Sequence, residues 1–204
     1  MAITDLHCVE GSDYMAVIWA WDHPTTARIT VTRLLDGQVL SKTVVDSDAY
    51  NEARLGAYHG PRVKKVNVPV RVTVESEDGQ EKQETELLGQ KYIVEWYMER
   101  QRTFRKRFLA RKELLSEQWN LVLVFPCEGS VPEDLFYYTL GGTPAGADGV
   151  KGFLPSLKCG KNVYGMLPAP GRPILYCNPK HKEISRLFDF KHIADRELPD
   201  LEVK

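Results

Sequence analysis

The first half of the chain alternates hydrophobic and polar residues over short runs, and this period of two predicts β-strands. In residues 14–22, Val17, Trp19 and Trp21 fall on one face of an extended chain. Pro24 follows and ends this run, because proline cannot donate a hydrogen bond to a strand ladder. We therefore expect an early strand whose tryptophans are buried in a core.

Tight turns separate the next runs. Residues 28–34 alternate strictly, and Asp36-Gly37 joins them to the β-rich residues 39–45. An Asp-Gly pair between two such runs is a strong hairpin signal, because both central residues of a type I′ turn need positive φ. The sequence thus predicts a hairpin here, closed by a type I′ turn.

The same rhythm returns further along the chain. Residues 66–74 place a valine at every second position, although Pro69 indicates an edge or a bulge in that strand. Asp78-Gly79 then forms a second turn signal, and residues 81–88 can return as a polar edge strand. Short strands at this spacing are typical of a sandwich or barrel.

Together these features resemble the fibronectin type III family over roughly residues 1–88. The resemblance rests on Trp21 followed by Pro24, on the strand at residues 28–34, on the Asp36-Gly37 hairpin and on residues 66–74. Residues 49–65 depart from the family, with Tyr50 and Tyr58 as candidates for its tyrosine corner. The resemblance implies a spacer or a protein- or carbohydrate-binding module without catalysis.

The second half predicts another β domain. Strand-like runs begin at Tyr92 and recur at residues 120–125, 135–140, 173–177 and 184–190. The fold class we expect is therefore all-β, with two tandem β-sandwich-like domains at residues 1–89 and 90–204, the first of fibronectin type III or immunoglobulin type.

Two segments of this half are ambiguous. Residues 100–117 fit either one basic helix or two strands extending the sheet begun at Tyr92, and alternation favours strands. The glycine-rich loop at 141–149 is either functional or simply mobile, and we favour mobility. It is no phosphate loop, because it lacks the GxxxxGK[ST] order and no clear helix follows.

Composition narrows the classes of function. Charged residues make up 27% of the chain, and the formal net charge of -1 gives no field that would attract nucleic acid or an anionic membrane. The apolar runs are too short to cross a bilayer, and the N-terminus does not read as a signal peptide. Four scattered cysteines do not form a disulfide framework, so we expect a cytoplasmic protein.

The strongest candidate for binding is a basic run interleaved with phenylalanines. We take as its binding residues Arg100, Arg102, Arg105, Lys106, Arg107 and Arg111, together with Trp96 on the preceding strand. Three interpretations stay open: a solvated face balanced by nearby glutamates, a docking site for an acidic protein, and a nucleic-acid surface. The near-zero net charge disfavours nucleic acid.

Metal binding and catalysis have weaker signals. Cys159, Cys177 and His181 are weak zinc candidates with Cys127 or His192 as a fourth ligand, but paired Cys-x2-Cys spacing is absent. The chain has no GxSxG or HExxH motif, and its histidines are scattered. We therefore expect no cofactor and no metal, and favour a non-enzyme.

These observations lead to one expectation with two alternatives. We expect a non-catalytic protein-interaction or scaffold module whose partner is another protein. The first alternative is a carbohydrate-binding accessory module, which needs an exposed pair of aromatic rings. The second is a metal-dependent or hydrolytic enzyme with an unrecognised site. The oligomeric state stays open.

Overall fold

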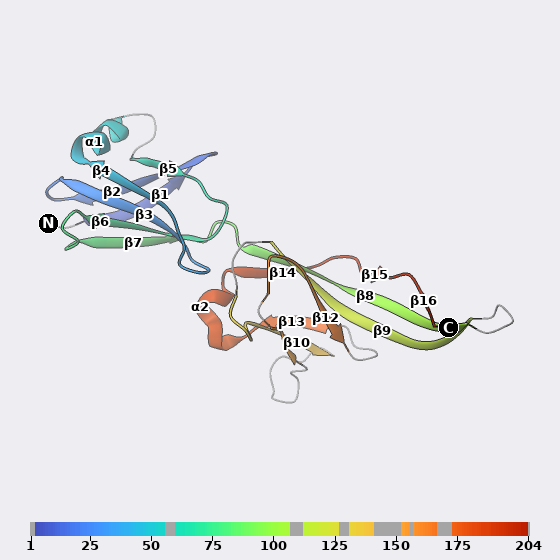
Figure 1. The fold of residues 1–204 in the computed structure, drawn as a ribbon. Coiled ribbons are helices and arrows are strands. Elements are labelled where there is room, and N and C mark those ends of the chain that lie inside the picture. Colours follow the sequence, from blue (N-terminus) through green and yellow to red (C-terminus); the bar gives the residue numbers. More distant parts are fainter. Residues whose placement is uncertain are drawn as a thin grey trace. The chain divides into compact units, whose positions relative to one another are not determined.

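The protein, seen here as a computed structural model, divides into two compact units, Met1–Lys91 and Tyr92–Lys204 (Figure 1). Both units are built mainly of β-strands, so the fold is all-β. The structure describes residues 3–55, 60–106, 112–126, 131–140, 152–155, 157–166 and 173–203. No helix among these is long and apolar enough to cross a lipid bilayer.

The N-terminal unit consists of two antiparallel sheets (Figure 1). One has the order β1-β2-β5, formed by Ile3–Glu10, Tyr14–Trp21 and Arg62–Lys64. The other has the order β4-β3-β6-β7, formed by Val39–Asp46, Thr26–Arg33, Val70–Ser76 and Lys82–Leu87. The polar strand β7 lies at a sheet edge, as residues 81–88 predict.

The core of this unit collects the alternating apolar side chains of both sheets. Ile29 on β3 and Val72 on β6 are fully buried, and Trp19 on β2 is 1% exposed. The burial of Trp19 confirms that this tryptophan belongs to the core. Burying each such side chain contributes about 1.5–3 kcal/mol relative to exposure.

A helix that the sequence did not predict covers the Trp19 end of this core. Helix α1 (Ser47–Leu55) begins after Asp46, whose carboxylate accepts a hydrogen bond from the Ala49 amide at 2.7 Å. Tyr50 on α1 is buried, its ring lies 4.5 Å from the Trp19 ring, and its hydroxyl donates to the Trp19 carbonyl. Tyr50 therefore ties α1 to β2.

Both Asp-Gly turns form hairpins, but neither is of type I′. Gly37 and Gly79 have φ of 72° and 69°, whereas neither aspartate has a positive φ. Each aspartate instead accepts a hydrogen bond at 3.1 Å from the amide two residues further on. The hairpin prediction is thus confirmed and the turn type was wrong, because the aspartate side chain stabilises an alternative turn.

The valine-rich strand starts later than the alternation predicts. Strand β6 begins at Val70, directly after Pro69, whose carbonyl accepts a hydrogen bond from Leu34. Val66 and Val68 still pack against the core without belonging to a strand. The period of two therefore extends further than the ladder, because proline interrupts the hydrogen bonding.

The C-terminal unit is organised around a long antiparallel hairpin, β8 (Tyr92–Lys106) and β9 (Lys112–Phe125). This confirms strands over most of residues 100–117, with 107–111 outside the described residues. Strand β12 (Gly160–Met166) pairs with β9. Three short strands pair in parallel with β8, namely β14 (Phe188–His192), β15 (Arg196–Glu197) and β16 (Leu201–Val203).

A smaller sheet packs on one face of this larger one. It has the order β11-β10-β13, formed by Gly152–Phe153, Phe136–Leu140 and Pro173–Cys177. The Phe136 ring meets the Phe188 ring edge-on at 5.2 Å, and Phe125 lies 5.7 Å from Phe188. The short helices η1 (Pro179–His181) and α2 (Lys182–Ser185) connect β13 to β14. Aromatic contacts thus hold the two layers together.

Candidate protein-binding surface

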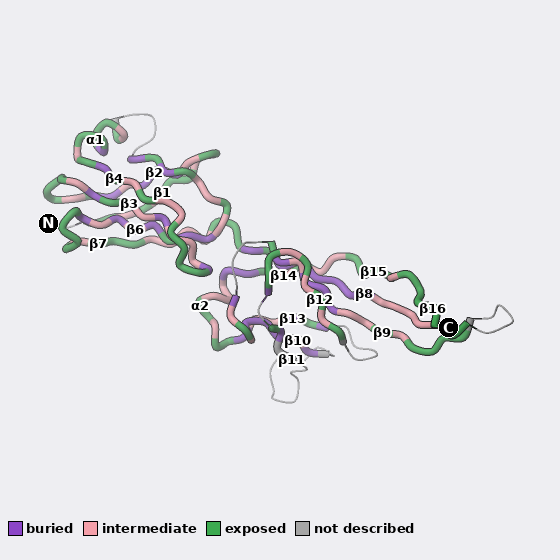
Figure 2. Tube along the Cα trace, in the orientation of Figure 1, coloured by how far each residue is buried: buried purple, intermediate pink, exposed green. Residues whose placement is uncertain are grey.

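The long hairpin continues past the region where the smaller sheet covers it. Strand β12 pairs with β9 only from Trp119 to Phe125, and beyond this point β8, β9, β15 and β16 form a ribbon (Figure 1). We call residues 100–106, 112–118 and 196–203 the arm. No residue of the arm whose side chain is described is buried (Figure 2). The arm therefore presents both of its faces to solvent.

The arm exposes four large aliphatic side chains. The exposed fractions are 54% for Leu114, 50% for Leu115, 50% for Leu201 and 47% for Val203. The register sets Leu114 opposite Phe104. Leu201 and Val203 stand beside Thr103 and Arg105, which alternate with Phe104 along β8 and therefore point to the other face. Apolar surface on both faces of a thin ribbon is typical of an interaction site.

Most described cations of the arm are paired within the arm or with its neighbours. Arg100 contacts the carboxylates of Glu117, at 3.6 Å, and Glu197. Arg102 lies 3.9 Å from Glu197. The Lys106 ammonium similarly lies 3.8 Å from the Glu202 carboxylate. The Arg105 side chain is exposed. Arg107 and Arg111 lie outside the described residues.

This pairing changes the meaning of the basic run. The sequence places seven cations close together along the chain, namely the six cations named above and Lys112. The sheet brings glutamates from β9, β15 and β16 beside the cations of β8. The described part of the arm is therefore a surface of mixed charge. Exposed ion pairs of this kind contribute about 0–1 kcal/mol each.

Trp96 does not belong to this surface. It is 8% exposed, and its ring lies 4.4 Å from the His192 ring in the region where β14 pairs with β8. The Trp96 ring therefore packs within the sheet and contributes little to the exposed surface of the arm.

A β-bulge shapes the arm. Arg102 stands opposite Glu117 and Phe104 opposite Leu114, so the pairing shifts by one residue between Thr103 and Phe104. Leu114 and Glu117 consequently point to the same face although they are three residues apart. Leu115 is the additional residue in the bulge.

A buried carboxylate lies on β8 just before the arm. Glu99 is 4% exposed, and Lys161 on β12 donates to it at 2.7 Å, which raises the pKa of Lys161 above its usual range. The guanidinium of Arg196 lies 4.4 Å from the centre of the Tyr97 ring, next to this pair. The buried charge of Glu99 is thus compensated by Lys161.

The zinc candidates do not converge. Among the residues that the structure describes, no three His, Cys, Asp or Glu side chains are close enough to hold a metal ion. Cys159 is exposed in the segment before β12, whereas the thiol of Cys177 points toward the Ser185 carbonyl at 3.9 Å. The glycine-rich loop at 141–149 and Cys127 lie outside the described residues.

His181 instead forms a pair with a carboxylate. Its Nε2 lies 2.7 Å from Oδ1 of Asp134, a residue with a φ of 61°. The buried Asn178 donates to the Asp134 carbonyl at 3.0 Å and accepts from the Lys180 amide at 3.1 Å. A histidine oriented by a carboxylate could act as a base, but no described nucleophile is bonded to His181. The geometry favours a link between η1 and the segment before β10.

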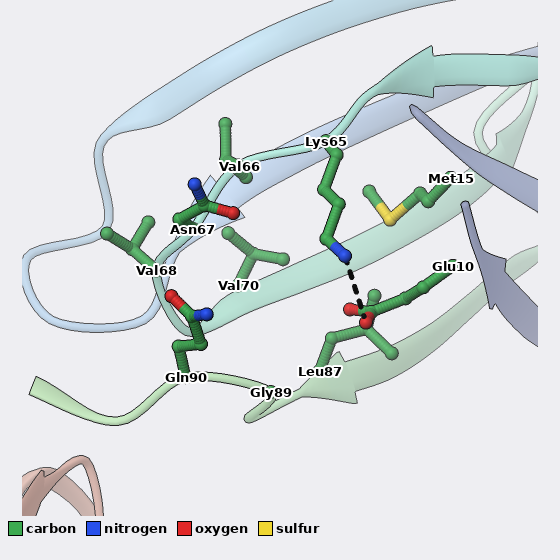
Figure 3. Close-up of a pocket in the computed structure, with 10 residues that line it drawn as sticks. All are labelled: Glu10, Met15, Lys65, Val66, Asn67, Val68, Val70, Leu87, Gly89 and Gln90. Carbon is green, nitrogen blue, oxygen red and sulfur yellow. Dashed lines mark ion pairs between the residues drawn. The ribbon is translucent and has the colours of Figure 1, made fainter. Parts of the chain in front are cut away.

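The N-terminal unit contains a pocket of about 270 Å³ between its two sheets (Figure 3). Met15, Val70 and Leu87 contribute apolar walls. The ion pair between Lys65 and Glu10, at 3.5 Å, lies on one side. The volume lies just under the range of about 300–1,000 Å³ that is usual for ligand pockets.

Comparison with protein-family models, curated proteins and solved structures found no match for this chain. The fold and the arm place the chain in a broad structural class. It is an all-β protein with a ribbon whose two faces are both exposed.

Sequence reasoning identified the segment but missed its apolar residues. Leu114 and Leu115 interrupt a charged run, and Leu201 and Val203 alternate with charged residues over 200–204. Aliphatic residues isolated between charged ones are the sequence signal that could have indicated this exposed apolar surface. Their exposure depends on strand pairing that short-range patterns do not contain.

Proposed function

We propose that this protein is a non-catalytic interaction module that binds another protein through the arm. The observation that carries the proposal is the half-exposed aliphatic set of the arm, which the smaller sheet does not cover. A thin ribbon with apolar side chains on both faces gains stability when a partner covers it. The mixed charge of the arm would form the polar rim of such an interface.

We further propose that the N-terminal unit is fibronectin type III-like and serves as a spacer or a second contact module. The three-stranded and four-stranded sheets packed around Trp19 support this view. The position of Tyr50 on α1 departs from the family, whose tyrosine corner lies on a strand. A cytoplasmic location remains part of the same proposal.

The two alternatives have less support. A carbohydrate module needs exposed aromatic rings, whereas Trp19 and Trp96 are buried and Trp21 meets Trp19 edge-on at 83°. Among the described residues, the Asp134–His181 pair is the candidate for catalysis, and no described nucleophile is bonded to His181. We therefore keep protein binding as the single proposed function.

Affinity capture from a lysate of the source organism tests the proposal. The purified chain is compared with the variant Leu114→Ser/Leu201→Ser, which removes one aliphatic group from each face of the arm. The matched control is Val44→Ser, because Val44 is 66% exposed on β4 of the N-terminal unit.

We expect a protein that wild type and Val44→Ser retain equally and the arm variant retains at least about tenfold less, as for a residue at the centre of an interface. Equal retention by all three forms would place the contact elsewhere. Exposed serines should leave folding unchanged, which circular dichroism checks.

A further inference from the structure

The two faces of the arm differ in how their charges are arranged. Arg100 and Arg102 point to the same face because they alternate along β8. The register sets Glu197 of β15 beside Arg100. It also sets Glu117 of β9 opposite Arg102, so both carboxylates share that face with the arginines. The ion pairs that join these side chains therefore lie on one face, which we call the paired face. Lys106 points the same way and pairs with a carboxylate of β16.

The opposite face, which we call the outer face, has cations without such carboxylates. Neither Arg105 nor Arg196 forms an ion pair with a residue that the structure describes. The register sets Glu113 opposite Arg105, yet no ion pair joins the two. The outer face comprises Gln101, Thr103 and Arg105 of β8 with Arg196, Leu201 and Val203 of the strands beside it.

Arg196 is held ready for a carboxylate. Its guanidinium lies 4.4 Å from the centre of the Tyr97 ring, which is 2% exposed and whose hydroxyl donates to Glu99 at 3.4 Å. The Glu99 carboxylate in turn compensates Lys161, so the positive charge of Arg196 remains. A guanidinium stacked on a fixed ring can still donate two hydrogen bonds to a carboxylate. Because the stacking orders it beforehand, binding costs less side-chain entropy.

Aliphatic side chains lie along the outer face between these two cations. Arg196 stands beside residue 99, Leu201 beside Thr103 and Val203 beside Arg105. From residue 99 to residue 105 an extended strand rises about 20 Å. Leu201 and Val203 are 50% and 47% exposed, and β16 is open to solvent along its length (Figure 2). The outer face is therefore an apolar strip with a cation at each end.

This pattern favours an acidic protein over nucleic acid. Proteins that bind single strands combine a groove of cations with exposed aromatic rings on which bases stack. On the outer face, the Tyr97 ring is buried beneath Arg196. Leu201 and Val203 separate Arg196 from Arg105, whereas a nucleic-acid backbone carries a phosphate at every step.

We propose that the outer face of the arm binds an acidic segment of another protein, in which apolar side chains lie between two carboxylates about 20 Å apart. One carboxylate pairs with Arg196 and the other with Arg105, and the apolar side chains cover Leu201 and Val203. This inference rests on the proposed function, because it names the chemistry of the protein that the arm binds.

Fluorescence anisotropy with the full chain and a labelled synthetic peptide tests this complementarity. The acidic probe is Glu-Thr-Val-Thr-Val-Thr-Glu with blocked termini, which sets its glutamates and valines on one face of an extended strand at about 20 Å between the ends. In the neutral probe, glutamines replace both glutamates. The acidic probe should bind at least about tenfold more tightly than the neutral one, and the difference should shrink as salt is added.

Charge reversal assigns the contact to a face. Arg105→Glu/Arg196→Glu should weaken binding of the acidic probe at least about tenfold and should prefer a probe in which lysines replace both glutamates. The matched control is Arg102→Glu/Lys106→Glu, which makes the same change of charge on the paired face. It should alter the affinity for the acidic probe by less than about threefold in physiological salt.

Circular dichroism and thermal melting check that each variant is folded. Arg196→Glu brings a carboxylate near the buried Glu99, so Arg196→Gln serves as a second variant that removes the charge alone. It should weaken binding of the acidic probe at least about fivefold, because a hydrogen bond between charged groups is lost.

A preference for the acidic probe that the outer-face variant reverses and the paired-face variant keeps would support the proposal. Equal affinity for the acidic and neutral probes overturns it, as does the absence of binding at about 1 mM. A preference that both double variants retain overturns it as well. Tighter binding of a single-stranded oligonucleotide, lost on reversal of Arg105 and Arg196, would replace the acidic protein by nucleic acid.

Affinity capture distinguishes these failures from failure of the proposed function. A protein that is captured through Leu114 and Leu201 while the acidic probe does not bind would show that the arm binds a partner of different chemistry. The proposed function would then stand, and the acidic segment would be excluded.

Discussion

At the scale of single residues, the two cysteines on β1 and before β12 differ sharply in environment. Burial raises the pKa of the Cys8 thiol to about 12, and the charge of Glu10 adds to this effect. Cys159 is exposed. Since the thiolate is the reactive form, Cys8 should be chemically inert in the native protein.

We therefore predict that iodoacetamide at pH 8 alkylates Cys8 at least about a hundredfold more slowly than Cys159, because a pKa near 12 leaves little thiolate. Peptide mass spectrometry over a time course measures both rates. In guanidinium chloride the two rates should become similar. Equal rates in the native protein would contradict the described environment of Cys8.

Among the described glycines, Gly60 is the one at which an added Cβ would lie nearest to another atom. Its φ is 102°, and a Cβ there would lie 2.4 Å from the Val17 carbonyl oxygen of β2. Gly60→Ala should thus lower the free energy of unfolding of the N-terminal unit by at least about 2 kcal/mol. Gly165→Ala is the control, because a Cβ there meets open space. Urea unfolding of both variants decides the comparison.

At the scale of elements, the pair of Glu99 and Lys161 connects β8 to β12. Lys161→Met leaves the buried Glu99 carboxylate without its half-exposed cation, so it should destabilise the C-terminal unit by about 1–3 kcal/mol. The double variant Glu99→Gln/Lys161→Met should recover most of that loss, since an amide carries no charge. Urea titrations of the three forms measure this. A harmless single substitution would show that another group compensates Glu99.

Local patterns predicted the strands that lie on a simple period of two. Residues 29 and 31 alternate cleanly on β3, and the apolar run at 121–125 ends the long strand β9. Strand β12 escaped prediction because Gly160 and Gly165 bracket it, and glycine weakens the strand signal. Helix α1 was not predicted because its sequence has few apolar residues, so that Tyr50 alone does not produce a helical pattern.

The candidate site was predictable in location but not in character. The basic run marks the arm in the sequence, yet Arg100 and Arg102 acquire Glu197 as a neighbour only through parallel pairing with β15. Glu197 is far away along the chain, so no spacing rule brings it beside them. The same long-range pairing decides that Leu201 and Val203 belong to the arm.

At the scale of the whole molecule, each unit has its own buried core, with Val72 in one and Val122 in the other, both fully buried. We predict two thermal transitions in differential scanning calorimetry. Val72→Ala should lower one of them, at a cost of about 2 kcal/mol, and Val122→Ala the other. A single transition that both variants shift equally would show that the units unfold together.

The parallel strands of the C-terminal unit also set an order of events during synthesis. Strand β8 is the first strand of its unit, and its neighbours β14, β15 and β16 are the last to be made. Met98 and Asp195, which bond across this junction, are 97 positions apart. The ribosome therefore extends the chain through most of this unit while one side of β8 still awaits its neighbours. A nascent chain in that condition exposes a strand edge, and holding it apart from other nascent chains is a task for chaperones.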